Sequence, residues 1–312
     1  MIPMPAATGP SFDVMRPADW AGGVIFASPH SGRDYPGWFL AESMLDPHVL
    51  RSSEDAFVDR LIAPAVAAGA VTLTARVPRC VVDLNRGADE LDPAAIEGTP
   101  SRRADPRIQS GLGVIPRVVA QGRAIRRGKL SGAEAQRRIE ALWRPYHAAL
   151  ESLMAEAVAR HGRAILIDVH SMPREALLHL QAPPPEIVLG DRNGASADPA
   201  ISEAVHGALV EAGFRVRRNS PFAGAYVAAT YGRPLRGQHV VQVEIDRSLY
   251  MDEGAVRPHA GFDGLAARLA GVIARIARLP LDGTGLPLAA ECRGPIPRSR
   301  PSGCGGRGRS WS

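Results

Sequence analysis

The chain has 312 residues, of which 45% are hydrophobic and 22% are charged, and its formal net charge at pH 7 is +5. This composition is typical of a globular protein, and the length allows one α/β domain with a substantial buried core. This composition excludes an intrinsically disordered chain. The sequence also contains no apolar run of the roughly 18 residues that a membrane span requires.

The basic charge is concentrated at the carboxyl end. Residues 291–312 contain five arginines against Glu291, so this segment contributes +4 and leaves about +1 for the rest of the chain. A basic nucleic-acid-binding body is therefore not expected. The three cysteines suggest no disulfide framework, and the first residues lack the basic and then apolar order of a signal peptide. We expect a cytoplasmic protein.

Short β-rich runs alternate with helical patterns along the chain. In chain order, the patterns predict a strand at 23–28, a helix at 53–68, strands at 71–75 and 80–84, a helix at 131–160, strands at 164–169 and 185–189, a helix at 199–212, strands at 214–217 and 239–246, and a helix at 260–278. This alternation predicts an α/β fold with three layers, in which helices cover both faces of a mainly parallel central sheet.

Two segments do not fit this pattern. Residues 87–118 contain four prolines among charged residues, which predicts a long ordered loop near the functional site. From about residue 291 the Gly, Pro, Ser and Arg content is typical of disorder. We therefore predict one catalytic domain over residues 1–290 and a disordered tail over residues 291–312.

Polar side chains follow or end three of the predicted strands. His30 comes after an apolar run, His170 ends the run Ile-Leu-Ile-Asp-Val-His, and Glu244 lies late in a third run. Ligands of open parallel sheets bind beyond the carboxyl ends of the strands, and two imidazoles with a carboxylate are typical of catalytic zinc. Asp168 projects to the same side as His170 and is placed to orient it. For either histidine alone, the alternative is a hydrogen bond to the backbone.

A third metal ligand is expected from the acidic pair Glu54 and Asp55. Both precede a predicted helix, and acidic residues at a helix start also stabilise the helix dipole without any metal. Between the two, Glu54 is preferred over Asp55 by a narrow margin.

Asn85 and Arg86 end another predicted strand. A planar guanidinium is suited to bidentate binding of a carboxylate, which predicts an acidic substrate. The alternative for Arg86 is an ion pair with Asp83 or Asp89. Arg233 precedes the strand of Glu244 and is a candidate second cation, although a turn with a solvated arginine is an equal alternative.

Taken together, these segments resemble the N-formylglutamate amidohydrolase family over roughly residues 10–290. The matching segments are Ser28-Pro29-His30-Ser31-Gly32, Glu54-Asp55 with Val58-Asp59, Asp83-Leu84-Asn85-Arg86, Gly113-Val114-Ile115-Pro116-Arg117, Arg144-Pro145-Tyr146-His147, Asp168-Val169-His170-Ser171 and Gln242-Val243-Glu244-Ile245-Asp246-Arg247. The family looks related to zinc carboxypeptidases and aspartoacylases, which share an α/β fold with a mixed sheet. The resemblance implies that the central sheet of this chain is mixed, as in zinc carboxypeptidases, and it implies zinc-dependent hydrolysis of an N-acyl acidic amino acid.

The resemblance also implies roles for individual residues. His30 and His170 resemble zinc ligands, Glu244 resembles the general base, and Asn85 with Arg86 resembles the clamp for the substrate carboxylate.

The sequence departs from the carboxypeptidase pattern at one position. That pattern has a glutamate ligand three residues after the first histidine, and this chain has Arg33 there. The third metal ligand is then expected to be Glu54, Asp55 or Asp34. His147 also belongs to the resemblance, without an assigned role.

We predict hydrolysis of N-formyl-L-glutamate to formate and L-glutamate, as in histidine degradation, with Zn²⁺ as the cofactor. The alternatives are a deacylase of another N-acyl acidic amino acid and a catalytically silent protein that contacts nucleic acid through its basic tail. The expected partner is a small acidic N-acyl amino acid, with no nucleic acid and no membrane, and the expected assembly is a monomer or a small homo-oligomer.

Overall fold

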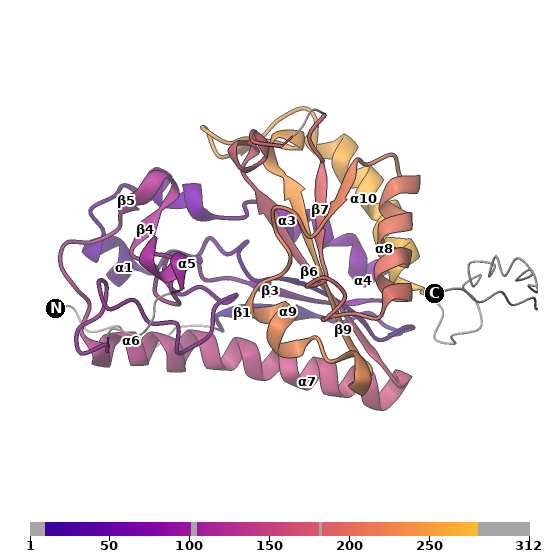
Figure 1. Cartoon of the computed structure of the whole chain (residues 1–312), viewed down its shortest axis with the longest axis horizontal. Coiled ribbons are helices and arrows are strands. Elements are labelled where there is room, and N and C mark those ends of the chain that lie inside the picture. Colours follow the sequence, from indigo (N-terminus) through magenta and orange to yellow (C-terminus); the bar gives the residue numbers. More distant parts are fainter. Residues whose placement is uncertain (1–9, 101–104, 181–182, 280–312) are drawn as a thin grey trace, which may run out of the picture. The chain divides into compact units, whose positions relative to one another are not determined.

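A seven-stranded mixed sheet organises the protein (Figure 1). The computed structural model describes residues 10–100, 105–180 and 183–279. The strands are, in their order across the sheet, β1 (Phe12–Met15), β3 (Val71–Ala75), β2 (Val24–Ser28), β6 (Ala164–Met172), β9 (Gln238–Asp246), β7 (Ile187–Gly190) and β8 (Val216–Arg218).

The four central strands run in one direction. β3, β2, β6 and β9 are parallel to one another. At the two sides of this group, β1 pairs antiparallel with β3 and β7 pairs antiparallel with β9, and β8 is parallel to β7. The predicted mixed α/β sheet is therefore confirmed. Because the central strands are parallel, their carboxyl ends lie at one edge, where ligand sites of such sheets form.

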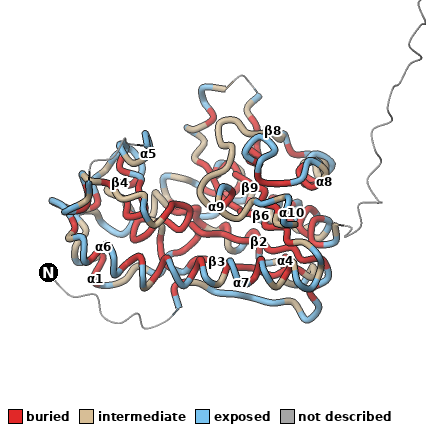
Figure 2. The backbone as a smooth tube through the Cα atoms, turned by 60° about the horizontal axis from the view of Figure 1, so that its bottom comes forward, coloured by how far each residue is buried: buried red, intermediate tan, exposed pale blue. Residues whose placement is uncertain are grey.

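Helices cover both faces of the sheet. α3 (Val58–Ile62), α4 (Pro64–Ala67), α8 (Pro199–Glu211) and α10 (Phe262–Ala277) pack on one face, and α7 (Arg144–His161) and α9 (Tyr226–Tyr231) pack on the other. Side chains alternate accordingly, since Ile167 packs in the first layer and Leu166 in the second. Figure 2 shows that burial is concentrated along these strands.

The remaining elements are short and lie mostly in the connections. They are α1 (Gly37–Glu42), α2 (Pro47–Leu50), η1 (Arg51–Ser53), α5 (Pro106–Gln109), β4 (Val118–Val119), η2 (Ala120–Gly122), β5 (Arg123–Ala124), α6 (Gly132–Arg138), the π-helical turn η3 (Ile139–Trp143), η4 (Arg174–Leu177), η5 (Pro234–Arg236), η6 (Arg247–Leu249), β10 (Met251–Asp252) and β11 (Arg257–Pro258). Among them, α1, α5, β4 and β5 lie together to the left of the sheet in Figure 1.

Two predicted elements are wrong. Residues 80–84 form no strand, because their backbone is bonded elsewhere: Val81 N–H donates to the Pro78 carbonyl in a turn at 3.0 Å, and Asp83 N–H donates to the Val114 carbonyl at 2.8 Å. The predicted helix over 53–68 begins only at Val58, after an extended segment that contains Glu54 and Asp55. This second difference decides which acidic side chain reaches the functional site.

The described residues belong to one structural unit, and no helix among them is long and apolar enough to cross a membrane. The tail predicted over residues 291–312 lies outside the described residues.

Gly32 sits where two segments of backbone meet. A Cβ atom at this position would lie 2.6 Å from the carbonyl carbons of Arg76 and Val77, a distance that forces the backbone apart. Asp34 N–H donates to the Arg76 carbonyl at 2.9 Å, which holds the same two segments together. The close approach therefore fixes the loop that carries His30.

We predict that Gly32→Ala destabilises the protein by about 1–3 kcal/mol, because the backbone must shift to admit the methyl group. The matched control is Gly37→Ala, where a Cβ meets no atom within 4 Å. Chemical denaturation measures both variants. Equal stability of the two variants would contradict the close approach at Gly32.

Candidate metal centre and active site

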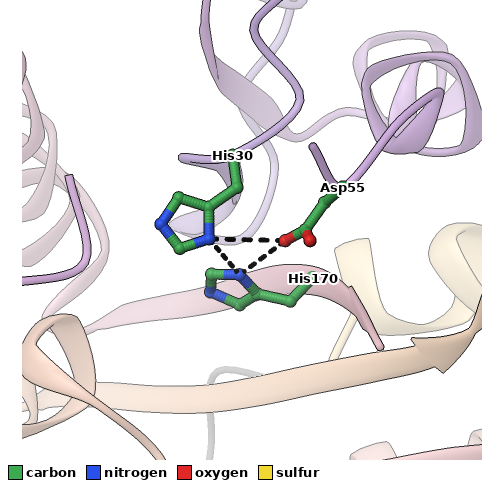
Figure 3. A group of neighbouring side chains, drawn as sticks. All are labelled: His30, Asp55 and His170. Carbon is green, nitrogen blue, oxygen red and sulfur yellow. Dashed lines mark hydrogen bonds and ion pairs between the residues drawn. The ribbon is translucent and has the colours of Figure 1, made fainter. Parts of the chain in front are cut away.

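Three buried side chains converge at the carboxyl ends of the central strands (Figure 3). His170 lies on β6, His30 follows β2 by two residues, and Asp55 lies in the extended segment before α3. His170 Nδ1 is 3.1 Å from His30 Nδ1 and 3.0 Å from Asp55 Oδ2, and His30 Nδ1 is 3.4 Å from the same oxygen. The chain thus brings two imidazoles and one carboxylate to a single point.

Each histidine has a carboxylate at its other ring nitrogen. Asp83 Oδ1 lies 2.7 Å from Nε2 of His30, and Asp168 Oδ2 lies 3.1 Å from Nε2 of His170. An ionised carboxylate only accepts hydrogen bonds, so each Nε2 carries the proton. This pairing leaves the Nδ1 lone pairs free to bind a cation, the arrangement that outer carboxylates give to metal-binding histidines.

The electrostatics of the group require a positive charge at this point. Burial alone would lower the pKa of His170, but attraction to Asp168 and hydrogen bonds to Asp168 and Asp55 raise that pKa well above its usual range. Burial opposes ionisation of Asp55, yet its hydrogen bonds to the two histidines hold the Asp55 pKa well below normal. Either a proton on His170 or a metal ion supplies this charge, and His30, Asp55 and His170 could hold the ion.

Asp55 is oriented by two contacts. Its backbone N–H donates to the His30 carbonyl at 2.9 Å, and its Oδ1 accepts from Arg247 Nη2 at 3.0 Å. Arg247 is itself held by Ser171, whose Oγ accepts from the arginine Nε at 3.1 Å. Oδ2 of Asp55 therefore faces the two imidazoles.

Glu54 points elsewhere, which corrects our preference for it over Asp55. Adjacent residues of an extended segment project to opposite sides, and the Glu54 carboxylate accepts from Tyr35 at 2.8 Å and from Arg51 at 3.2 Å. Asp34 is more than half exposed and pairs with Arg76. Neither residue belongs to the converging group.

Glu244 lies beside the group on β9. It is paired in register with His170 on the neighbouring strand, so both side chains project from the same face of the sheet. Burial, together with the nearby Asp55 charge, raises the pKa of Glu244 to about 7, although the charges of the two histidines and of Arg79 act in the opposite direction. Gln242 Nε2 donates to Glu244 Oε1 at 2.9 Å, which orients the carboxyl group. A carboxyl with a pKa near neutrality is suited to accept and return a proton.

Asn85 and Arg86 follow Asp83 closely in the chain and lie next to the group of His30, Asp55 and His170. Asn85 Nδ2 is 3.0 Å from His170 Nε2 and 3.4 Å from Asp168 Oδ2. Arg86 is buried, its Nε has no hydrogen-bond partner among the described residues, and its ion pair with Glu90 is long at 3.6 Å. A buried guanidinium with a free donor is a good receptor for a carboxylate.

Arg233 lies in a different part of the protein. It precedes the amino end of β9, whereas Glu244 lies near the carboxyl end, and it lines a separate cavity of about 400 Å³ with Trp143, His147 and Tyr231. This position corrects its prediction as a second cation for the substrate: a residue that precedes β9 lies at the amino end of the strand, and the length of the strand separates it from Glu244.

A larger cavity opens beside the metal group. It has a volume of about 800 Å³, and its lining includes four arginines, Arg51, Arg79, Arg123 and Arg247, and four carboxylates, Glu54, Asp83, Glu175 and Glu253. Arg79 Nη2 donates to Asp83 Oδ2 at 2.7 Å, which links the cavity wall to His30. The guanidinium groups on this wall are suited to bind a carboxylate.

Sequence reasoning assigned no role to Asp83, Arg79 or Arg247. Asp83 and Arg247 lie within segments that carry the family resemblance, and this resemblance is the sequence signal that could have identified them as site residues. Their contacts join residues up to 192 positions apart, and sequence spacing alone does not indicate such pairs.

The model of the N-formylglutamate amidohydrolase family matches residues 22–251. The chain belongs to the N-formylglutamate amidohydrolase family. The chain is 34% identical over 189 residues to an N-formylglutamate deformylase of Pseudomonas putida and 32% identical over 236 residues to one of Pseudomonas aeruginosa. These matches cover 59% and 74% of this chain and 66% and 83% of the relatives. The predicted family and the prediction of an amidohydrolase are confirmed.

Solved structures agree with the fold of this family. A crystal structure of N-formylglutamate amidohydrolase from Ralstonia eutropha JMP134 matches with a TM-score of 0.80 and 37% identity, over 85% of this chain and 96% of that one. A gene product of Agrobacterium tumefaciens shares the fold with a TM-score of 0.60 and 21% identity, over 86% of this chain and 95% of that one.

We predict that Asp55→Asn weakens zinc binding by roughly 100-fold or more, because the amide removes the anionic ligand atom. Glu54→Gln is the matched control, since its side chain faces Tyr35 and Arg51 and should leave the affinity within about threefold of wild type. Competition with a fluorescent chelator measures both affinities. If Glu54→Gln loses zinc binding and Asp55→Asn keeps the wild-type affinity, the third metal ligand is Glu54 and not Asp55.

Proposed function

We propose that this amidohydrolase uses zinc to hydrolyse N-formyl-L-glutamate to formate and L-glutamate. The observation that carries the proposal is the convergence of His30 Nδ1, His170 Nδ1 and Asp55 Oδ2, with separations of 3.0–3.4 Å. Ligand atoms about 2.0–2.1 Å from a tetrahedral zinc ion lie roughly 3.3–3.4 Å apart, so this set fits zinc and leaves a fourth position open. The names of the relatives support the substrate.

A bound zinc ion would polarise the formyl carbonyl and lower the pKa of a water molecule toward roughly 7. Glu244 would accept a proton from the attacking water and later deliver it to the leaving amine of glutamate. Its buried position gives it the required basicity, because desolvation raises its pKa to about 7. Gln242 holds one carboxyl oxygen and leaves the other available for proton transfer.

The substrate carboxylates would bind to cations beside the centre. Arg86 offers an Nε that has no partner among the described residues, and Arg79, whose Nη2 donates to Asp83, lines the large cavity. Asn85 keeps Arg86 close to His170, because its NH₂ group donates to Asp168, the carboxylate partner of that imidazole. Two cations near the reacting amide favour a dicarboxylate and orient its formyl group toward the metal ligands.

A deacylase of another N-acyl acidic amino acid is the second candidate, because the cavity of about 800 Å³ also admits larger acyl groups. A catalytically silent binding protein has less support, since the metal ligands and the candidate base lie together. The cytoplasmic location and the use in histidine degradation stay predictions from the sequence.

The test is formate release from N-formylglutamate by the zinc-loaded protein. We expect turnover that a chelator abolishes and zinc restores. N-formylleucine should be a poorer substrate by at least about tenfold, because it lacks one carboxylate. Faster acetate release from N-acetylaspartate would support the second candidate, and no turnover of any substrate by zinc-loaded protein would contradict an amidohydrolase.

Replacing the candidate base separates chemistry from metal binding. Glu244→Gln should lower kcat by roughly 10²–10⁴-fold while zinc remains bound, because the amide cannot accept the proton. In wild type, kcat/KM should fall as the pH drops through a pKa at or below about 7, since protonation removes the base and a bound cation lowers its pKa. A wild-type rate in Glu244→Gln would exclude Glu244 as the base.

A further inference from the structure

His147 is a buried histidine of α7 that the proposed reaction does not use. Its Nε2 lies 3.0 Å from the carbonyl oxygen of Leu84, and its Nδ1 lies 2.9 Å from the hydroxyl of Tyr231 on α9. The Trp143 ring packs against the imidazole with a centroid distance of 3.9 Å, and the Tyr231 ring is stacked on it at 5.9 Å. The imidazole therefore joins a loop and a helix that are far apart in the sequence.

The hydrogen bonds determine the protonation of His147. A carbonyl oxygen only accepts, so Nε2 carries the proton and donates it to Leu84, and Nδ1 accepts from the Tyr231 hydroxyl. Burial lowers the pKa of His147 to about 4, which keeps the ring neutral in this arrangement near neutral pH. The neutral imidazole thus binds both partners, with Nε2 donating to Leu84 and Nδ1 accepting from Tyr231.

The loop side of this contact leads directly to the metal centre. Leu84 precedes Asn85, whose Oδ1 accepts from the backbone N–H of Val227 at 2.8 Å. That bond turns the NH₂ group of Asn85 toward Asp168 Oδ2, the carboxylate oxygen that accepts from His170 Nε2. The orientation of Asn85 thus depends on the loop staying against the first turn of α9.

The helix side leads to the candidate base. The N–H of Ala225, at the start of α9, donates to Gln242 Oε1 at 3.0 Å. This bond turns the Gln242 NH₂ group toward Glu244 Oε1 at 2.9 Å. First-turn N–H groups have no partner within the helix, so the amino end of α9 is free to orient the amides of both Asn85 and Gln242.

We propose that His147 is a positioning residue, which clamps the loop of Asn85 to α9 and so holds Asn85 toward Asp168, the partner of His170, and Gln242 toward Glu244. The inference rests on the proposed function for its catalytic consequence. The clamp itself is a property of the chain without metal or substrate, so the two are tested separately.

The test compares four variants. His147→Phe removes both hydrogen bonds and keeps an aromatic ring, Tyr231→Phe removes one bond, and His147→Gln retains a donor toward Leu84. The matched control is Leu150→Ala, one turn further along α7, which removes a fully buried side chain that contributes to the core and not to the clamp.

The first readout is hydrogen exchange of the Ala225 and Val227 amides in the metal-free protein. We expect exchange about tenfold faster in His147→Phe, a smaller increase in Tyr231→Phe, and partial recovery in His147→Gln. Leu150→Ala should lower the melting temperature without selective loss at these two amides. If His147→Phe does not fold, the comparison of amide exchange at Ala225 and Val227 between Tyr231→Phe and Leu150→Ala decides the result.

The second readout is function. The zinc affinity and kcat should each fall by about tenfold in His147→Phe, with a smaller change in KM, because ligand and base lose their orientation while the substrate cations remain. Unchanged exchange at Ala225 and Val227, or a zinc affinity and kcat that fall equally in Leu150→Ala, would overturn the clamp. Absence of zinc binding by wild type would contradict the proposed function instead and leave the exchange result to decide the clamp.

Discussion

The structure of the site depends on one electrostatic constraint, which is that three buried acceptor atoms face one another. Two imidazole nitrogens and a carboxylate oxygen lie within 3.4 Å, and each is backed by a charged group: Asp83 behind His30, Asp168 behind His170, and Arg247 behind Asp55. Buried acceptors in mutual contact are unfavourable unless a positive charge lies between them. The surrounding contacts maintain this arrangement and thereby prepare a cation site.

The fold meets this constraint through the parallel register of its central strands. β6 and β9 pair over their full length, which places His170 beside Glu244 and Asp168 beside Gln242 on one face. β2 runs parallel to β6 and delivers His30 to the same edge. A shift of one residue in either pairing would turn these side chains into the opposite layer, so the apolar residues that fix the register also fix the site.

The sequence predicts the parts of the site that follow from strand periodicity. His30, His170 and Glu244 stand at or just beyond the ends of apolar runs, and the prediction that they gather at one edge needed only the parallel sheet. Asp55 was harder to identify, because the pattern around it resembles a helix start and the chain is in fact extended there. Arg233 was misplaced for a different reason, since closeness in the sequence to the strand of Glu244 does not make it close in space to a residue at the opposite end of that strand. The contacts of Asp83 and Arg247 are made by tertiary folding, and local patterns do not contain that information.

We propose that His30, Asp55 and His170 together bind one metal ion. Anomalous diffraction at the zinc edge, from crystals of the zinc-loaded protein, locates that ion. We expect one strong peak about 2.0–2.2 Å from both Nδ1 atoms and from Asp55 Oδ2. A peak held by other side chains, with these three residues still bonded to one another, would contradict it.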